Sequence, residues 1–289
     1  MRFAKYHGAG NDFLLVEDLD DRVALTPSLV EAMCDRFRGA GADGLIRVTR
    51  SDRAPFALEL WNADGGRAEM SGNGMRCVAR FLLDRGLIRD TEIDMDTPAG
   101  VKRVRVTLAD GEMTSARVDM GPPVLRRGAI PMAGPAGERF VDEPFPDAGP
   151  EYRAAAVSMG NPHLVLVGAE DLGALDLPRI GPPLEHHRDF PERTNVEWIR
   201  VEDGRIDVRV WERGVGETLA CGTGACASLV AASLMGLVGR RAAVRFEGGD
   251  LDVDWAGDDH VYLSGPAVHV YDGELSPEWM ASLAEDARR

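Results

Sequence analysis

Two nucleophilic residues stand at the start of matching glycine turns, 150 positions apart. Ser71 opens the run Ser-Gly-Asn-Gly, and Cys221 opens the run Cys-Gly-Thr-Gly. Each run precedes a segment with helical spacing of apolar residues, so each nucleophile is predicted at a helix N-terminus, where unpaired N–H groups and a positive partial charge attract anions. Glycine lets a ligand approach the backbone closely. The pattern predicts a carboxylate-binding turn in each half of the chain.

A thiol at such a turn has a physical reason to be reactive, because a helix N-terminus lowers the pKa of a cysteine. We therefore expect a lowered pKa for Cys221. Cys34 and Cys77 lie on apolar helical faces and are expected to be buried and inert. If Ser71 and Cys221 flank one carbon, they could remove a Cα proton from one side and deliver another from the opposite side. The two helix N-termini would stabilise the carboxylate during that step.

Other landmarks recur at the same offset of 150 residues. The repeated features are an asparagine after glycine, a tryptophan before a polar residue, and a glycine–leucine pair: Asn11 and Asn161, Trp61-Asn62 and Trp211-Glu212, Gly86-Leu87 and Gly236-Leu237. A constant period indicates a structural duplication. We expect a first domain over 1–120, completed by 265–289, and a second over 121–264.

The expected elements are strands, hairpins and a few helices. Short apolar runs predict strands over 3–7, 13–17, 44–49, 56–61 and within 246–271, and Asp-Gly turns predict hairpins over 101–120 and 196–211. Helices are expected after Thr26, with Leu29, Val30, Met33 and Phe37 on one face, after each glycine turn, and after Ser276.

These elements predict an α+β fold of two pseudosymmetric domains, each a mostly antiparallel sheet or barrel wrapped around a central helix. We expect antiparallel pairing because, on this interpretation, the sequence has too few helices to connect parallel strands by crossovers. The stretch 121–150 is rich in proline and glycine and is expected to be a loop or linker at the domain junction.

The composition excludes several classes of protein. The net charge of −15 argues against non-specific nucleic-acid binding. The longest apolar run, 225–238, falls short of the roughly 18 residues that a membrane span requires, and the N-terminus lacks the apolar core of a signal peptide. We therefore expect a cytoplasmic protein with reduced thiols. The spacing of cysteine and histidine does not match a zinc site, so no metal is expected.

Structural explanations exist for each feature alone. A glycine turn can serve small-residue packing at a helix start, the repeated asparagines can be turn residues, and Glu212-Arg213 can be a solvated ion pair. Each half, however, combines a polar residue after tryptophan, an asparagine after glycine and a nucleophile in the glycine turn. Packing alone does not require all three to recur together, so the joint pattern favours a functional interpretation.

At these residues the sequence resembles the diaminopimelate epimerase family. The resemblance spans both halves and is carried by FAKYHGAGNDF at 3–13, RFRGAGADGLI at 36–46, WNADGGRAEMSGNGMRCVARF at 61–81, GNPHLV at 160–165, TNVEW at 194–198 and ERGVGETLACGTGACA at 212–227. It implies an enzyme without a cofactor that interconverts LL- and meso-diaminopimelate, in the pathway to lysine and peptidoglycan precursors, with two catalytic cysteines. It also implies a fold of two similar halves. Because members of the family often form homodimers, it implies a homodimer as well.

The resemblance assigns roles to particular residues. It implies that Cys221 is one catalytic cysteine and that His163 and Glu212 adjust the thiol pKa values. Backbone donors to the reacting carboxylate are implied at four positions: Gly72, Asn73, Gly222 and Thr223. Contacts with the distal amino-acid end of the substrate are implied at five: Asn11, Asn62, Asn161, Asn195 and Arg213. The chemistry agrees, since an arginine can bind a carboxylate bidentately and Glu212 can meet an ammonium or a thiol proton.

The sequence departs from the family at two places. Gly44 stands where some members have a glutamine, and Ser71 stands in place of the second cysteine. A serine hydroxyl is a far weaker acid than a thiol, so symmetric exchange between two thiols is lost. Three explanations remain open: an engineered substitution, a natural variant in which Ser71 or a water it holds is the acid, and altered chemistry with Cys221 as the single base.

The retained residues Asn62, Asn195 and Arg213 favour diaminopimelate as the substrate. The leading hypothesis is therefore a diaminopimelate epimerase whose activity is reduced by Ser71. The alternatives are a catalytically silent amino-acid binder and a racemase or dehydratase of another amino acid.

Overall fold

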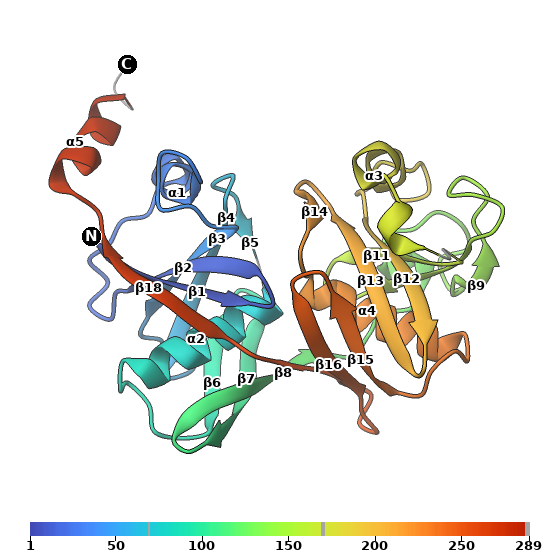
Figure 1. Cartoon of the computed structure of the whole chain (residues 1–289), viewed down its shortest axis with the longest axis horizontal. Coiled ribbons are helices and arrows are strands. Elements are labelled where there is room, and N and C mark those ends of the chain that lie inside the picture. The colour runs from blue at the N-terminus through green and yellow to red at the C-terminus, as the bar shows by residue number, and fades with distance from the viewer. Residues whose placement is uncertain (69, 169–170, 287–289) are drawn as a thin grey trace. The chain divides into compact units, whose positions relative to one another are not determined.

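The computed structural model describes residues 1–68, 70–168 and 171–286. The chain forms two compact units, one of Met1–Val118 with Pro266–Arg289 and the other of Asp119–Gly265 (Figure 1). Residue 69, within the motif at 61–81, and residues 287–289, at the end of the C-terminal segment, lie outside the described part.

The first unit contains nine strands and three helices of the described residues. The strands are β1 (Arg2–Gly8), β2 (Asn11–Glu17), β3 (Gly44–Thr49), β4 (Phe56–Asn62), β5 (Arg67–Ala68), β6 (Glu92–Thr97), β7 (Gly100–Ala109), β8 (Glu112–Gly121) and β18 (Val268–Glu274); the helices are α1 (Pro27–Cys34), α2 (Gly72–Asp84) and α5 (Pro277–Asp286). The strands pair in the order β18-β1-β2-β3-β4-β6-β7-β8, with β5 beside β4.

The second unit repeats this arrangement. Its strands are β9 (Val141–Pro144), β10 (Arg153–Ser158), β11 (Pro162–Val167), β12 (Asn195–Glu202), β13 (Arg205–Glu212), β14 (Gly216–Thr218), β15 (Arg241–Phe246), β16 (Gly249–Trp255) and β17 (Val261–Gly265); its helices are α3 (Leu177–Glu185) and α4 (Gly222–Leu234), with short 3-10 turns η1 (Arg127–Ala129) and η2 (Leu172–Ala174). The pairing order is β9-β10-β11-β12-β13-β15-β16-β17, with β14 beside β13. The α+β prediction is confirmed.

Antiparallel pairs are the majority, as predicted. The reason offered for this, that the chain has too few helices to cross over between parallel strands, was wrong. Each unit has two parallel pairs, and a helix connects the strands of each one: α1 joins β2 to β3, α2 joins β4 to β6, α3 joins β11 to β12, and α4 joins β13 to β15. A parallel pair needs a crossover connection, usually a helix. The four helices α1 to α4 are therefore enough for these four parallel pairs, because each pair needs only one connecting helix.

The helices α2 and α4 are the central helices of the two units. In α4 the side chains from Ala225 to Ala232 are buried, and the helix lies against β10, β11, β12, β13, β15, β16 and β17. A helix that is apolar on all sides must be buried in this way. Both helices end before a glycine with positive φ, Gly86 and Gly236, as predicted. Cys77 in α2 and Cys34 in α1 are buried, and burial raises the pKa of both thiols to about 12, which agrees with an inert role.

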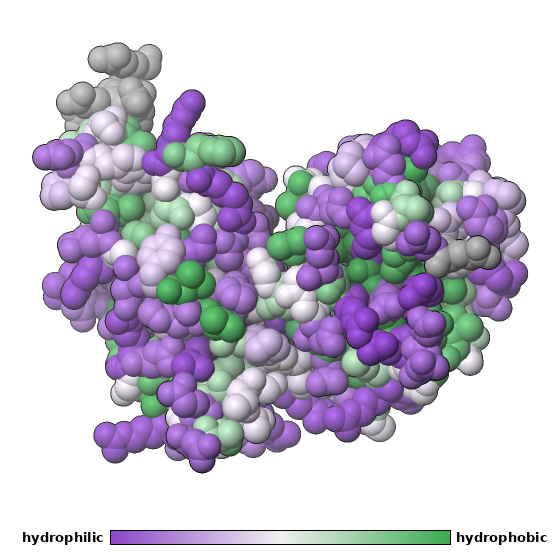
Figure 2. Space-filling view, viewed as in Figure 1, coloured by the Kyte–Doolittle hydropathy of each residue, from purple (hydrophilic) through white to green (hydrophobic). Residues whose placement is uncertain are grey.

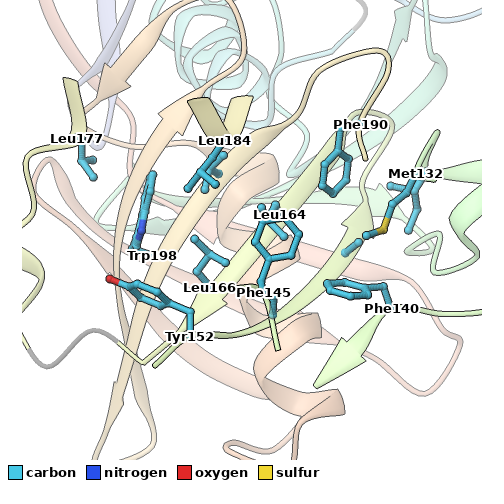
Figure 3. Packing of buried hydrophobic residues seen from close by; sticks show 14 residues of the cluster. Met132, Phe140, Phe145, Tyr152, Leu164, Leu166, Leu177, Leu184, Phe190 and Trp198 are labelled. Carbon is cyan, nitrogen blue, oxygen red and sulfur yellow. The ribbon is translucent and has the colours of Figure 1, made fainter. Parts of the chain in front are cut away.

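The stretch 121–150 is largely irregular, as expected for a loop, but it is not a linker that stands apart from the core. It contains η1 and β9, and Ile130, Met132, Phe140 and Phe145 belong to the same buried core cluster of the second unit as Trp198 of β12 (Figure 3). The prolines and glycines of this stretch shape turns, but its apolar side chains cover the face of the sheet opposite α4. Proline and glycine content was therefore a poor guide to burial here.

The first helix is shorter than predicted. Thr26 caps α1 by accepting a hydrogen bond from the Leu29 N–H, as expected. The helix ends at Cys34, because the Asp35 side chain accepts from the backbone N–H groups of Phe37 and Arg38. Phe37 is therefore 98% exposed instead of facing the core. The Asp-Gly hairpin turns and the helix after Ser276 are confirmed.

The surface in view is mainly hydrophilic, with scattered apolar residues (Figure 2). Among the described residues, no helix is both long enough and apolar enough to cross a membrane.

We predict that Trp198→Ala lowers the free energy of unfolding by about 3–5 kcal/mol, because it leaves a cavity under β12. The control is Phe37→Ala, which removes an exposed ring and should change stability by less than about 0.5 kcal/mol. Denaturant unfolding measures the free energy of unfolding of both variants. Far-UV circular dichroism is used to follow it, because tryptophan fluorescence would change when Trp198 is removed. Equal effects would contradict the assigned core.

Candidate active site

Ser71 and Cys221 hold the same structural position in the two units. Each is the N-cap of its central helix with extended backbone dihedrals, and its side chain accepts a hydrogen bond from the backbone N–H three residues later. The distances are 3.0 Å from Gly74 N to Ser71 Oγ and 3.4 Å from Gly224 N to Cys221 Sγ. The predicted placement of both nucleophiles at helix N-termini is confirmed. Each nucleophile therefore doubles as the cap that satisfies one orphan donor of its helix.

Three polar groups surround the Cys221 sulfur. The thiol donates to Glu212 Oε2 at 3.3 Å, Thr223 Oγ1 lies 3.4 Å away, and the third is the Gly224 N–H. Glu212 ends β13, and its other carboxyl oxygen accepts from the Thr218 hydroxyl on β14. Cys221 itself is only 4% exposed. The carboxylate is thus oriented to exchange a proton with the thiol.

The expectation of a lowered pKa at Cys221 was wrong for this structure. Burial raises the pKa of the thiol well above its ordinary value, and the charges of Glu212 and Glu197 raise it further. Hydrogen bonds from Thr223 and the Gly224 N–H lower it but do not offset these effects. Desolvation and two nearby carboxylates therefore outweigh the partial charge of one helix N-terminus.

Glu212 shows the same preference for its neutral form. Burial raises the pKa of its carboxyl, while its hydrogen bonds with Thr218 and Cys221 act in the opposite direction. Burial therefore favours the protonated form of both groups, and the hydrogen bond between them directs the thiol proton toward Glu212 Oε2.

Beneath the Cys221 turn lies a buried pair that sequence reasoning missed in part. His163 Nδ1 is 2.7 Å from Glu197 Oε1, and both side chains have no exposed surface. Glu197 lies within the TNVEW motif but was assigned no role. Strand alternation could have identified Glu197, because successive side chains of a strand point to opposite faces of the sheet. Val196 and Trp198 face the core opposite α4, so Glu197 between them faces the central helix.

His163 reaches Cys221 through two intervening side chains. His163 Nε2 contacts Asn161 Oδ1 at 3.0 Å, and Asn161 Nδ2 donates to Thr223 Oγ1 at 3.4 Å. Thr223 then contacts the sulfur. The resemblance grouped His163 with Glu212, but the structure places Glu212 in direct contact with the thiol and His163 at the far end of this relay.

The turn after β13 carries Arg213 and is held from below. Asn195 Oδ1 accepts from the Arg213 N–H at 2.9 Å, and Asn195 Nδ2 donates to the Pro162 carbonyl at 2.8 Å. The Arg213 guanidinium donates to the Glu192 carbonyl at 3.1 Å. The Asn195 amide is therefore engaged with backbone groups, which supports the position of Arg213.

Glu185, at the end of α3, is a second residue that sequence reasoning missed. Its buried carboxylate accepts from Trp211 Nε1 at 2.8 Å and from the Gly214 N–H at 2.9 Å. It thereby holds both ends of the segment that contains Glu212 and Arg213. A lone glutamate near the end of a proline-containing helix gave no sequence signal for this role.

In the first unit the corresponding relay is built from amides. Asn73 Nδ2 donates to Asn11 Oδ1 at 3.1 Å, at the same sequence separation as Asn161 and Thr223. Asn73 Oδ1 accepts from the buried Arg76 at 2.8 Å, and Asn11 Nδ2 donates to Asp43 Oδ2 at 2.8 Å. These contacts fix the Ser71 turn, in which Gly72 is buried.

Ionic contacts stabilise the base of this amide chain. Asp12 binds Arg36 and Lys5, and its oxygen accepts from the Asp43 N–H. Burial alone raises the pKa of the Asp12 carboxyl, but the hydrogen bonds and charges of Arg36 and Lys5 leave it lowered. Asp12 thus stays ionised and keeps Asp43 oriented toward Asn11.

Two further positions differ between the units. Asn62 is exposed at the end of β4, where the second unit has Glu212 at the end of β13, so Ser71 has an amide where Cys221 has a carboxylate. A Cβ at Gly44 would lie 2.5 Å from the Trp61 carbonyl oxygen. This backbone therefore accommodates glycine at position 44 and not the glutamine of some family members.

The comparisons with known proteins agree with one another. A family model described as Diaminopimelate epimerase matches residues 3–126 and 155–270. The diaminopimelate epimerase of Pelotomaculum thermopropionicum is 48% identical over 277 residues, covering 95% of this chain and 98% of that protein. The diaminopimelate epimerase of Moorella thermoacetica is 46% identical over 278 residues, covering 95% and 99%.

Solved structures show the same fold at low identity. A hydroxyproline epimerase from Agrobacterium vitis with bound trans-4-hydroxy-L-proline matches with a TM-score of 0.67 at 17% identity, covering 95% of this chain and 90% of that one. A phenazine biosynthesis protein of the PhzF family from Bacillus anthracis matches with a TM-score of 0.67 at 14% identity, covering 96% and 99%.

We predict that Glu212→Gln moves the pH midpoint for alkylation of Cys221 to lower pH, by about one unit or more. The sign follows because the Glu212 charge raises the thiol pKa, so its removal favours the thiolate. Mass spectrometry of the Cys221 peptide after iodoacetamide treatment gives the midpoint. Glu217→Gln, an exposed glutamate on neighbouring β14, is the control and should leave it unchanged. A midpoint that stays or rises in Glu212→Gln would refute the assignment.

Proposed function

We propose, since this chain belongs to the diaminopimelate epimerase family, that it interconverts LL- and meso-diaminopimelate by removing a Cα proton and returning one to the opposite face, without a cofactor. The observation that carries the proposal is the Cys221 thiol, which caps α4 and donates a hydrogen bond to Glu212. A cysteine used only for packing needs no carboxylate partner within a buried turn.

We propose Cys221 as the base for one stereoisomer. Glu212 accepts the thiol proton, and the resulting thiolate takes the Cα proton of the substrate. Burial raises the pKa of both groups, and the hydrogen bond from the Cys221 thiol to Glu212 Oε2 provides the path for this proton transfer. The negative charge left on the substrate spreads into its carboxylate, which the first-turn N–H groups of Gly222 and Thr223 stabilise.

We propose that Ser71, or a water that it holds, serves the other protonation step. The Ser71 cap geometry matches that of Cys221, which supports equivalent use of the two turns. A hydroxyl is a much weaker acid than a thiol, and Asn62 supplies no charge to assist it. Turnover is therefore slower than that of a two-thiol enzyme, and the first-turn N–H groups at Gly72 and Asn73 bind the carboxylate in the same way.

We propose that Arg213 binds the distal carboxylate of diaminopimelate, because a guanidinium provides bidentate donors and this one makes no ion pair with the described residues. Asn11, Asn62, Asn161 and Asn195 complete recognition of the distal amino-acid group. For Asn195 the support is indirect, since its amide holds the Arg213 backbone.

We also infer that the enzyme works in the cytoplasm. Its four cysteines are free and the substrate belongs to biosynthetic metabolism, both of which suit a reducing compartment.

The loss of one thiol at position 71 favours a second candidate function, that of a catalytically silent amino-acid binder. Such a protein would bind diaminopimelate in calorimetry while its α-protons stay in place. A racemase or dehydratase with Cys221 as its single base is the remaining alternative, and it would exchange the α-proton of another amino acid in preference to diaminopimelate.

We predict that the protein incorporates deuterium at Cα of diaminopimelate in heavy water under reducing conditions, as measured by NMR. Cys221→Ala should abolish exchange while binding by calorimetry persists. Absence of exchange with either stereoisomer would exclude the epimerase, and binding without exchange would establish the silent binder.

We predict that Ser71→Cys raises kcat by orders of magnitude, because a thiol is a far better proton donor at neutral pH. Ser28→Cys, which adds a thiol at the exposed start of α1, is the matched control and should leave kcat unchanged. An unaltered rate in Ser71→Cys would show that the serine is adequate for protonation.

A further inference from the structure

The buried pair of Glu197 and His163 has no counterpart in the first unit. Strand register identifies the equivalent residues: β11 pairs His163 with Asn195, and β2 pairs Phe13 with Gly44. Phe13 therefore matches His163, and Ile46, two residues beyond Gly44, matches Glu197.

The close approach to the glycine turn supports this match. A Cβ on Gly224 would lie 2.8 Å from Glu197 Oε1, and a Cβ on Gly74 would lie 2.7 Å from Ile46 Cδ1. The fold thus supports the same turn with an apolar pair in one unit and an ionisable pair in the other. Because a buried ion pair can often be replaced by packed apolar residues without loss of stability, stability alone does not explain Glu197.

The relay between Glu197 and the Cys221 sulfur has a defined direction. Asn161 accepts from His163 Nε2, so its Nδ2 faces Thr223 and donates there. Thr223 Oγ1 has one proton, and since it accepts from Asn161, that proton is directed to Cys221 Sγ. A donated hydroxyl proton stabilises the thiolate.

In this direction His163 Nε2 donates to Asn161 Oδ1, because an amide oxygen can only accept. Nδ1 of the same ring lies 2.7 Å from Glu197 Oε1. The buried carboxyl group therefore holds the imidazole with its Nε2 toward Asn161.

We propose that Glu197 is a positioning residue for the proton chemistry of Cys221. By contacting His163 at Nδ1, it holds the imidazole so that Nε2 donates to Asn161. Asn161 in turn orients Thr223 so that its hydroxyl donates to the Cys221 sulfur. The proposal rests on the proposed role of Cys221 as base, and it adds a residue that does not touch the substrate or the sulfur.

Two mechanisms of action for Glu197 have opposite signs. The titratable side chains that face Cys221 in the described structure are Glu212 from β13, Glu197 from β12 and His163 from β11. If the Glu197 charge acted on the sulfur directly, its removal would favour the thiolate. If Glu197 acts through the relay, its removal loses the Thr223 hydrogen bond and disfavours the thiolate.

The test is the pH dependence of Cys221 alkylation in Glu197→Ile, which installs the residue of the first unit. This assay needs no substrate, so its outcome is independent of whether the protein proves to be an epimerase. We expect the midpoint to move to higher pH, with alkylation at pH 8 roughly threefold to tenfold slower, as for the loss of one hydrogen bond to a charged group. In Thr223→Val, which removes the last donor, the Glu197→Ile change should have no further effect.

The double variant His163→Phe with Glu197→Ile copies the complete apolar pair of the first unit and guards against misfolding of the single variant. It should give the same shift to higher pH, with far-UV circular dichroism like that of the parent. A midpoint that is unchanged or moves to lower pH overturns the proposal, and so does a Glu197→Ile effect that persists undiminished in Thr223→Val.

Discussion

The structure depends on the need to satisfy the first turn of a helix that is buried on all sides. The N–H groups of that turn have no partners within the helix, and burial removes water as a substitute. In α2 and α4 the side chain that caps the turn, Ser71 or Cys221, is also the residue that we propose for proton transfer. Position and chemistry are therefore coupled: the backbone fixes the nucleophile, and the nucleophile completes the backbone. Glycines are needed around it because a side chain there would collide with the supporting strands. A Cβ on Gly74 or on Gly224 would lie less than 3 Å from a side-chain atom of the neighbouring strand.

Burial also sets the electrostatic character of this turn. The thiol of Cys221 and the carboxyl of Glu212 both have raised pKa values, although a helix N-terminus favours negative charge. The partial charge of a helix end is a modest effect that water and geometry reduce, whereas desolvation acts on the entire charge of the ionised form. The structure therefore favours a protonated thiol at Cys221, hydrogen-bonded to Glu212, over a free thiolate. Because the thiolate is the reactive form of cysteine, the thiol proton must be removed before Cys221 can act as a base.

Duplication supplied one backbone that the two units use differently. The strand order, the crossover helices, the capping turns and the side-chain contact between Asn11 and Asn73, or Asn161 and Thr223, are shared. The residues around the nucleophile are not. Cys221 contacts Glu212 at the end of β13 and has Glu197 and His163 beneath its turn. The equivalent positions in the first unit are Asn62, Ile46 and Phe13. The second unit therefore surrounds its capping residue with ionisable groups, and the first unit has uncharged residues at the same places.

The sequence by itself determined the features that depend on local or periodic information. Glycine after a capping residue specified both helix starts, Asp-Gly pairs specified the hairpins, and the offset of 150 residues revealed the duplication. It could not specify the burial of the apolar side chains within 121–150, the exposure of Phe37 or the raised pKa of Cys221, because each follows from what packs nearby. The supporting carboxylates Glu197 and Glu185 are separated from their partners by 34 and 26 residues, and no spacing rule connects them. Only the tertiary structure decided these contacts, since strand pairing and helix docking bring such residues together and remove the water that would otherwise screen their charges.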